Sequence, residues 1–261
     1  MRSGRLAFDP RPDDVYLASY ARSGTTWLQM ILYQLTTDGS MDFTHITQPI
    51  PYFERALMQG RDLNQLPSPR IFKTHLRYRE LPKGPYKRIY VARNGKDVLV
   101  SCYHFFLAHS TFKGSFDEFF QKFMVGNVPP GSWFRHVAEW SAHAADSNVL
   151  FLRYEDLVSD FERTLDRIAA FLERPIPKEK YASIAERCSF QFMKQHEDKF
   201  GFLQEVMLEN GFTGEGFIRQ GKTGTGKQYL SPSQEAAFDQ AASVVVMPPA
   251  LQEPPRVRYP G

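Results

Sequence analysis

The sequence predicts an α/β fold in which helices flank a central parallel sheet. Three short apolar runs, 15–20, 88–92 and 149–154, are rich in β-branched and aromatic residues, as is typical of buried strands. Each run is followed by a segment of helical periodicity, and strands that alternate with helices are typical of parallel sheets. A fourth run, 70–74, is expected to be the end of another strand.

Apolar residues at helical spacing predict the helices between and after these strands. In the first of them, Trp27, Leu28, Ile31, Leu32 and Leu35 lie on one face. The predicted helices span 25–35, 97–108, 116–123, 132–145, 161–172 and 233–245.

The last part of the chain is less regular. Residues 201–227 are rich in glycine and charge, and we expect a long mobile segment that orders on ligand binding. The proline-rich tail from about residue 247 is expected to be irregular. No repeat or linker divides the sequence, so residues 1–261 are predicted to form a single domain.

Composition excludes several classes of function. The net charge of +3, from 32 Lys and Arg against 29 Asp and Glu, is too small to predict nucleic-acid binding. No apolar run approaches the roughly 18 residues that span a bilayer, and residues 1–14 lack a signal-peptide core. Cys102 and Cys188 lack metal-ligand spacing and are interpreted as reduced, buried thiols. We therefore expect a cytoplasmic protein without a metal site.

A glycine-bearing loop, Tyr20–Trp27, connects the first strand to its helix. Backbone N–H groups at a helix N-terminus attract anions, and Gly24 allows a phosphate to approach closely. Arg22 can pair with an oxyanion, although an ordinary helix start is the alternative interpretation. The loop lacks the Lys of a Walker A motif, which argues against a magnesium-dependent kinase.

A candidate catalytic pair ends the strand at 70–74. Lys73 and His75 alternate along an extended chain and so lie on one side of it, at the strand end where open α/β sheets bind ligands. A free imidazole has a pKa of about 6.5 and can accept a proton from an attacking hydroxyl. Lys73 can stabilise negative charge on a leaving oxygen.

These segments together resemble the cytosolic sulfotransferase family over about residues 10–239. Tyr20–Trp27 is similar to the family's YPKSGTTW loop, with Ala for Pro and Arg for Lys. Arg93–Ser101 matches RNxKDxxVS at every fixed position, and Phe72–Leu76 is similar to KTHLP. Phe217–Gly224 resembles FxRKGxxGDWKN, with Gln for the first Lys. The resemblance implies a P-loop-like three-layer fold.

The resemblance also implies an activity and a set of ligands. It predicts transfer of a sulfuryl group from 3′-phosphoadenosine 5′-phosphosulfate (PAPS) to a hydroxyl or amine of a small, apolar acceptor, leaving 3′-phosphoadenosine 5′-phosphate (PAP) and requiring no metal. The catalytic residues that it implies are His75, Lys73 and Arg22. The donor-binding residues that it implies are Arg22, Ser23, Gly24, Thr25, Thr26, Trp27, Arg93, Ser101, Tyr154, Cys188, Phe190, Arg219, Gln220 and Gly221.

The sequence says less about the acceptor site and about the oligomeric state of the protein. The resemblance assigns Tyr52, Phe53, Tyr103 and Phe105 to the acceptor pocket. The family's C-terminal dimer motif is degraded after Lys227, which predicts a monomer or an atypical homodimer. A P-loop-type small-molecule kinase and a PAP-binding module without catalysis are the alternative functions. The intact Lys73 and His75 argue against the second of these.

Overall fold

The computed structural model describes residues 8–109, 111–201, 217–219 and 221–245. Within them, the strands β1 (Val15–Ser19), β2 (Ile71–Thr74), β3 (Lys87–Ala92) and β4 (Val149–Arg153) form one parallel sheet. The strand order is β2-β1-β3-β4, so the chain moves to one side of β1 for β2 and to the other side for β3. The central parallel sheet was predicted, and this topology confirms it.

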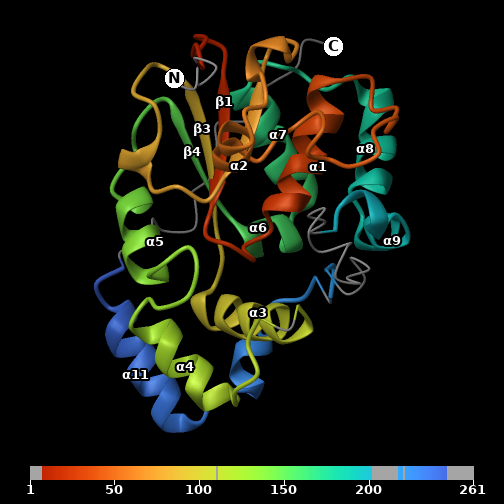
Figure 1. The fold of residues 1–261 in the computed structure, drawn as a ribbon. Coiled ribbons are helices and arrows are strands. Elements are labelled where there is room, and N and C mark those ends of the chain that lie inside the picture. The colour runs from red at the N-terminus through yellow and green to blue at the C-terminus, as the bar shows by residue number, and fades with distance from the viewer. Residues whose placement is uncertain (1–7, 110, 202–216, 220, 246–261) are drawn as a thin grey trace.

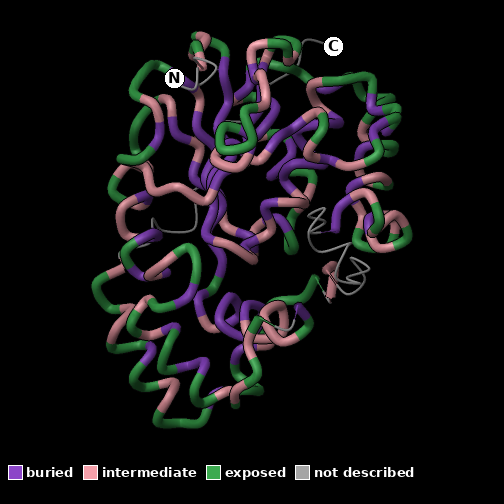
Figure 2. Tube along the Cα trace, in the orientation of Figure 1, coloured by how far each residue is buried: buried purple, intermediate pink, exposed green. Residues whose placement is uncertain are grey.

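Two apolar layers sandwich the sheet, because alternate residues of each strand point to opposite faces. Val15 and Leu17 of β1 face one layer, whereas Tyr16 and Ala18 face the other. Figure 2 shows this as a buried centre beneath a largely exposed exterior. The sheet is therefore covered on both faces, as all-parallel sheets require.

The first layer comes from α1 (Thr25–Thr36), α7 (Phe161–Phe171), α8 (Tyr181–Arg187) and α9 (Phe190–Gln195). In Figure 1, α1, α7 and α8 lie together on one side of the sheet. The long helices α1 and α7 were predicted from their apolar periodicity, whereas α8 and α9 are too short to show it.

The second layer comes from α2 (Phe53–Met58), α3 (Gly95–Ala108), α4 (Phe116–Met124), α5 (Trp133–Ser141) and α11 (Pro232–Ala242). Figure 1 shows α3 across the end of the sheet at which the strands finish, with α4 and α11 side by side beyond it. The short α6 (Tyr154–Ser159) follows β4 directly.

Several expected boundaries differ from the structure. The helix expected over 132–145 ends at Ser141, and the strand expected to include Tyr20 ends at Ser19. Much of the predicted mobile segment, 202–216 and 220, and the tail from 247 lie outside the described residues. Within the described part of the chain, every helix is too short or too polar to cross a membrane.

Candidate active site

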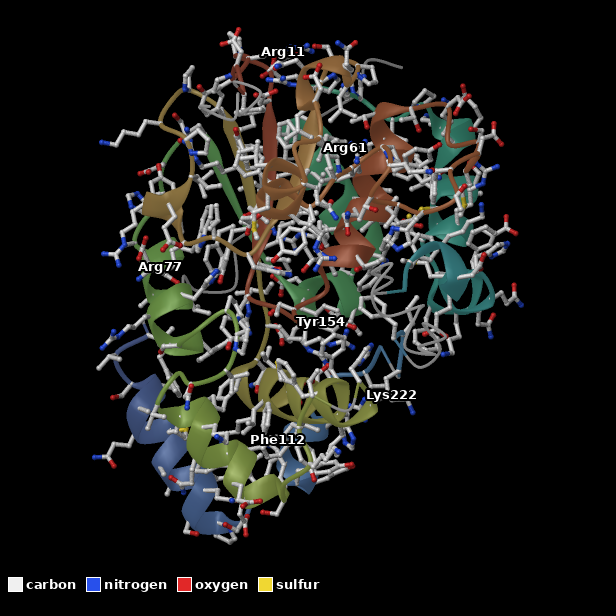
Figure 3. The ribbon with its side chains drawn as sticks, viewed as in Figure 1. Arg11, Arg61, Arg77, Phe112, Tyr154 and Lys222 are labelled. Atoms are coloured by element: carbon white, nitrogen blue, oxygen red, sulfur yellow. The ribbon has the colours of Figure 1, made fainter. Side chains whose placement is uncertain are left out.

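The site is a cavity of about 420 Å³ at the carboxyl end of the sheet. The connections that leave β1 and β3 diverge there to opposite sides of the sheet, and open α/β sheets bind ligands at such a switch point. Segments that follow all four strands line the cavity, together with residues of α2 and α3. In Figure 3, Tyr154 lies between the strand ends and α3, and Lys222 lies beside α3.

The loop between β1 and α1 is shaped for close contact with a ligand. Arg22 and Gly24 both adopt left-handed backbone conformations, with φ of 67° and 95°. A Cβ atom at Gly24 would lie 2.6 Å from Tyr154 Cδ2, so no larger residue fits there without movement. No side chain caps α1, and Thr25, Thr26 and Trp27 of its first turn line the cavity. Its backbone N–H groups are thus available to an anion.

Two arginines lie beside this loop. The Arg22 guanidinium lies 4.9 Å from the Phe105 ring and 4.8 Å from the Phe217 ring, and it donates to Ser101 Oγ and Phe217 O. Burial lowers the pKa of Arg22 to about 10, so the side chain remains charged at neutral pH. The residue that replaces the family's Lys is thus a half-buried cation.

The second arginine reaches the loop from the end of β3. Arg93 donates to Arg22 O at 3.1 Å and to Lys222 O at 2.9 Å, and it lies 4.5 Å from the Tyr154 ring. Its Nε–H group is buried and donates to no acceptor within the described residues. The motifs after β1 and β3, which are 71 residues apart, therefore meet at one point.

His75 and Lys73 lie together at the end of β2. His75 Nδ1 lies 2.8 Å from Ser19 O. Because a carbonyl only accepts, Nδ1 carries the proton and Nε2 keeps its lone pair. Burial and the Lys73 charge lower the pKa of His75 to about 3, and burial lowers the pKa of Lys73 to about 8. A neutral imidazole and an ammonium group thus lie side by side.

Two further side chains hold the backbone of His75. Glu54 Oε1 accepts its N–H at 3.0 Å, and His136 Nε2 lies 3.0 Å from its carbonyl oxygen. His136 Nδ1 in turn lies 2.9 Å from the Tyr90 hydroxyl, which donates to it. Sequence reasoning missed these supports because only the folded chain brings α2, β3 and α5 to His75.

The acceptor residues expected from the sequence divide into two groups. Tyr52 and Phe105 line the cavity, but Phe53 and Tyr103 do not. Phe53 packs in the core against Tyr16 and Phe72, because α2 directs consecutive residues to different faces.

Tyr103 packs against Phe116 and Phe119, on the opposite face of α3 from Phe105. The cavity is also lined by residues that were not expected from the sequence: Arg55, Phe106, His109 and the Pro129–Pro130 pair. Helical spacing could have identified one of them, because His109 is four residues after Phe105, at the end of the helix predicted over 97–108.

The structure also locates the remaining donor-site candidates. Trp27 stacks against Phe161 and donates to Cys188 O at 2.8 Å, and Ser23 is fully buried rather than at the cavity wall. Gln220 lies outside the described residues. Candidates that line the cavity are Arg22, Gly24, Thr25, Thr26, Trp27, Lys73, His75, Arg93, Ser101, Tyr154, Cys188, Phe190, Arg219 and Gly221.

The cavity wall is strongly cationic. No Asp or Glu is found among its described lining residues. Those residues also form no cluster of three His, Cys, Asp or Glu side chains that could hold a metal ion. The cations that line the cavity are Arg22, Arg55, Lys73, Arg93, Arg219 and Lys222. Such a wall suits a ligand with several negative charges.

Residues 12–246 match the family model described as the sulfotransferase domain. This chain belongs to the sulfotransferase family. It is 38% identical to human sulfotransferase 1E1 over 247 residues, which cover 89% of this chain and 83% of the relative. It is 36% identical to dog sulfotransferase 1B1, with the same two coverages.

Solved structures of sulfotransferases share the fold. A complex of mouse sulfotransferase SULT7A1 with PAP is 32% identical, with a TM-score of 0.72 over 90% of this chain and 84% of that one. A complex of retinol dehydratase with androsterone and PAP is 27% identical, with a TM-score of 0.76 over 91% and 80%.

The comparisons confirm three predictions for this sulfotransferase: the family, the P-loop-like three-layer fold and sulfuryl transfer as its function. PAP in the related structures agrees with the predicted PAPS donor. Neither the kinase nor the non-catalytic alternative is favoured.

Proposed function

We propose that this sulfotransferase transfers the sulfuryl group of PAPS to the hydroxyl, or less favourably the amine, of a small acceptor, with His75 as the base. The observation that carries the proposal is the hydrogen bond from His75 Nδ1 to Ser19 O. It leaves Nε2 as the proton acceptor, at a cavity that Lys73 also lines. The position and the protonation state of His75 thus both suit the role of general base.

The cavity fits a donor that carries phosphates. The loop at Gly24 has no room for a Cβ atom, the first turn of α1 is uncapped, and the wall is cationic. We infer that Arg22, Gly24 and the first turn of α1, Thr25–Trp27, bind the 5′-phosphosulfate. Arg93, Ser101, Arg219, Gln220 and Gly221 are assigned to the 3′-phosphate, and Trp27, Tyr154, Cys188 and Phe190 to the adenine.

The chain's own contribution to the chemistry is proton transfer and charge stabilisation. PAPS supplies the sulfuryl group when it is bound. As the acceptor oxygen forms its bond to sulfur, its proton passes to His75 Nε2. Lys73 and Arg22 stabilise the negative charge that develops on the oxygen leaving sulfur. No metal ion is needed for these roles.

We propose an apolar acceptor on the side of the cavity formed by Tyr52, Phe105 and Phe106. Aromatic walls with few polar groups are typical of pockets for lipophilic ligands. The retinol dehydratase structures, which contain androsterone or retinol, support this class of ligand.

We further propose a single-domain enzyme of the cytoplasm that acts as a monomer or an atypical homodimer. Both cysteines are buried and unpaired, which suits a reducing compartment. No interaction with nucleic acid or membranes is expected, since the net charge is only +3.

Calorimetric titration with PAP, with ATP as the comparison, tests the donor assignment. Micromolar binding of PAP with little binding of ATP is expected, because only PAP offers a 3′-phosphate to Arg93. Equal binding of the two nucleotides, or no binding of PAP, contradicts the assignment.

A further inference from the structure

The backbone on either side of the base is held by side chains from two helices. His75 is the first residue after β2, and the registered pairing of β2 with β1 ends one residue earlier, at Thr74. Strand pairing therefore does not fix the direction of the chain beyond this point. Glu54 accepts a hydrogen bond from the His75 N–H group, and His136 lies at the His75 carbonyl oxygen. These two side chains thus orient the peptide groups from which the imidazole projects.

Helix α5 holds the carbonyl side of this segment. His136 and Trp140 are four residues apart, so they share a face of the helix, and both are almost fully buried. His136 Nε2 lies 3.0 Å from His75 O, and Trp140 Nε1 donates to Leu76 O at 3.2 Å. One helix face therefore provides N–H donors to two successive carbonyl groups of the chain that leaves β2.

Tyr90 determines which nitrogen of His136 carries the proton. Its hydroxyl lies 2.9 Å from His136 Nδ1, and both side chains are buried. Because a carbonyl oxygen only accepts, Nε2 donates to His75 O and Nδ1 accepts from Tyr90. Burial lowers the pKa of His136 to about 4, so the ring is neutral and keeps this tautomer at neutral pH. The group that donates to the His75 carbonyl is thus itself fixed in the core.

The imidazole of His75 depends on this backbone for its direction. Its Nδ1 donates to Ser19 O, and this bond fixes the rotation of the ring. The bond requires the backbone to hold the ring at the end of β1. A His75 peptide group that could turn would move Nε2 relative to the acceptor hydroxyl, and a misplacement of about 1 Å can cost about a hundredfold in rate.

We propose that His136 is a positioning residue of the reaction: its hydrogen bond to the His75 carbonyl, with Tyr90 behind it, holds the base toward the acceptor hydroxyl. The proposal rests on the proposed function, because His136 has this role only if His75 is the base. Neither His136 nor Tyr90 is among the described residues that line the cavity. His136 should therefore affect turnover without affecting the binding of the donor.

Two substitutions of His136 test this role. His136→Phe keeps a ring in the core but has no N–H group, whereas His136→Gln places an amide donor near the position of Nε2. With saturating PAPS and 2-naphthol, kcat in His136→Phe should fall about tenfold or more, because the base is misplaced. His136→Gln should regain most of this loss. The Kd of PAP, measured by calorimetry, should be unchanged in both variants.

A milder variant covers the case in which His136→Phe does not fold. Tyr90→Phe keeps the ring and loses only the hydroxyl, so the tautomer of His136 is no longer fixed. It should lower kcat by a smaller factor than His136→Phe and leave the Kd of PAP unchanged. A normal kcat in Tyr90→Phe and in every folded His136 variant overturns the proposal.

A proton signal reports the position of His75 directly. The Nδ1–H group bonded to Ser19 O should give a downfield NMR resonance that exchanges slowly with water and is absent in His75→Ala. This resonance should be weakened or lost in His136→Phe and kept in His136→Gln. A role of His136 in packing alone would leave it unchanged.

Trp140→Phe is the matched control, because it removes the neighbouring hydrogen bond, to Leu76 O, from the same helix face. It should leave kcat and the resonance largely unchanged. Equal falls of kcat in Trp140→Phe and His136→Phe, or an unchanged resonance in His136→Phe, overturn the positioning role. Absence of the resonance from the wild type, or normal turnover in His75→Ala, contradicts the proposed function instead.

Discussion

The donor end and the acceptor end of the cavity are built in different ways. At the donor end, main-chain carbonyls fix the cations: Arg93 donates to Arg22 O and Lys222 O, and Arg22 donates to Phe217 O. At the acceptor end, the side chains come from α2, from α3 and from the end of β2, and ring contacts such as that of Tyr52 with His75 join them.

This difference indicates that residues at the donor end are fixed by the backbone, whereas residues at the acceptor end can be replaced. The donor end depends on loop geometry after strands, including two left-handed residues, one of which is a glycine that no larger residue can replace freely. Helix faces impose no such backbone condition, because any side chain of suitable size can occupy them. We expect the acceptor class to change through α2 and α3 while the donor end stays the same.

Replacement of His75 gives the largest expected effect and tests whether the two ends are separable. In His75→Ala, turnover should fall by about a hundredfold or more, since general-base catalysis contributes this much. PAP affinity should stay largely unchanged, because other residues bind the donor. Turnover is measured at saturating PAPS, and PAP binding is measured by calorimetry.

His143 is half-buried and does not line the cavity, so His143→Ala offers the control and should leave both quantities unchanged. Normal turnover in His75→Ala would refute the assignment of the base. Loss of both PAP binding and turnover in His75→Ala would show that the donor end and the acceptor end cannot be changed independently.

Replacement of Arg93 tests whether this residue binds the 3′-phosphate at the donor end. Arg93→Gln should weaken PAP binding by about ten- to hundredfold, the range expected for hydrogen bonds to charged groups. Binding of adenosine 5′-monophosphate, which lacks the 3′-phosphate, should change much less. Calorimetry on both nucleotides measures the difference.

Lys96→Gln is the matched control, since Lys96 lies in the same segment but pairs with Glu235 and Asp239. Equal losses for both nucleotides in Arg93→Gln would place the side chain at the 5′-phosphosulfate instead.

The same contrast explains what the sequence could predict. The strands and the long helices α1 and α7 follow from local periodicity, and the donor residues Arg22, Arg93 and Tyr154 lie just after strands. The helices α2 and α6 have six residues each, too few to show a period, and so the directions of Phe53 and Arg55 could not be assigned. The supports from Glu54 and His136 exist only through tertiary packing, which no local pattern records.

Deprotonation of Lys73 at high pH gives the smallest expected effect. It tests a residue that lies where the donor end of the cavity meets the acceptor end. Burial lowers its pKa to about 8, so the ammonium form is present below that pH and is lost as the pH rises. With a neutral alcohol as saturating acceptor, kcat/KM for PAPS should fall about tenfold per pH unit above this value. In Lys73→Arg the guanidinium stays charged, so this decline should disappear. No decline up to pH 9.5 in the wild type, or the same decline in Lys73→Arg, would show that another group controls donor capture at high pH.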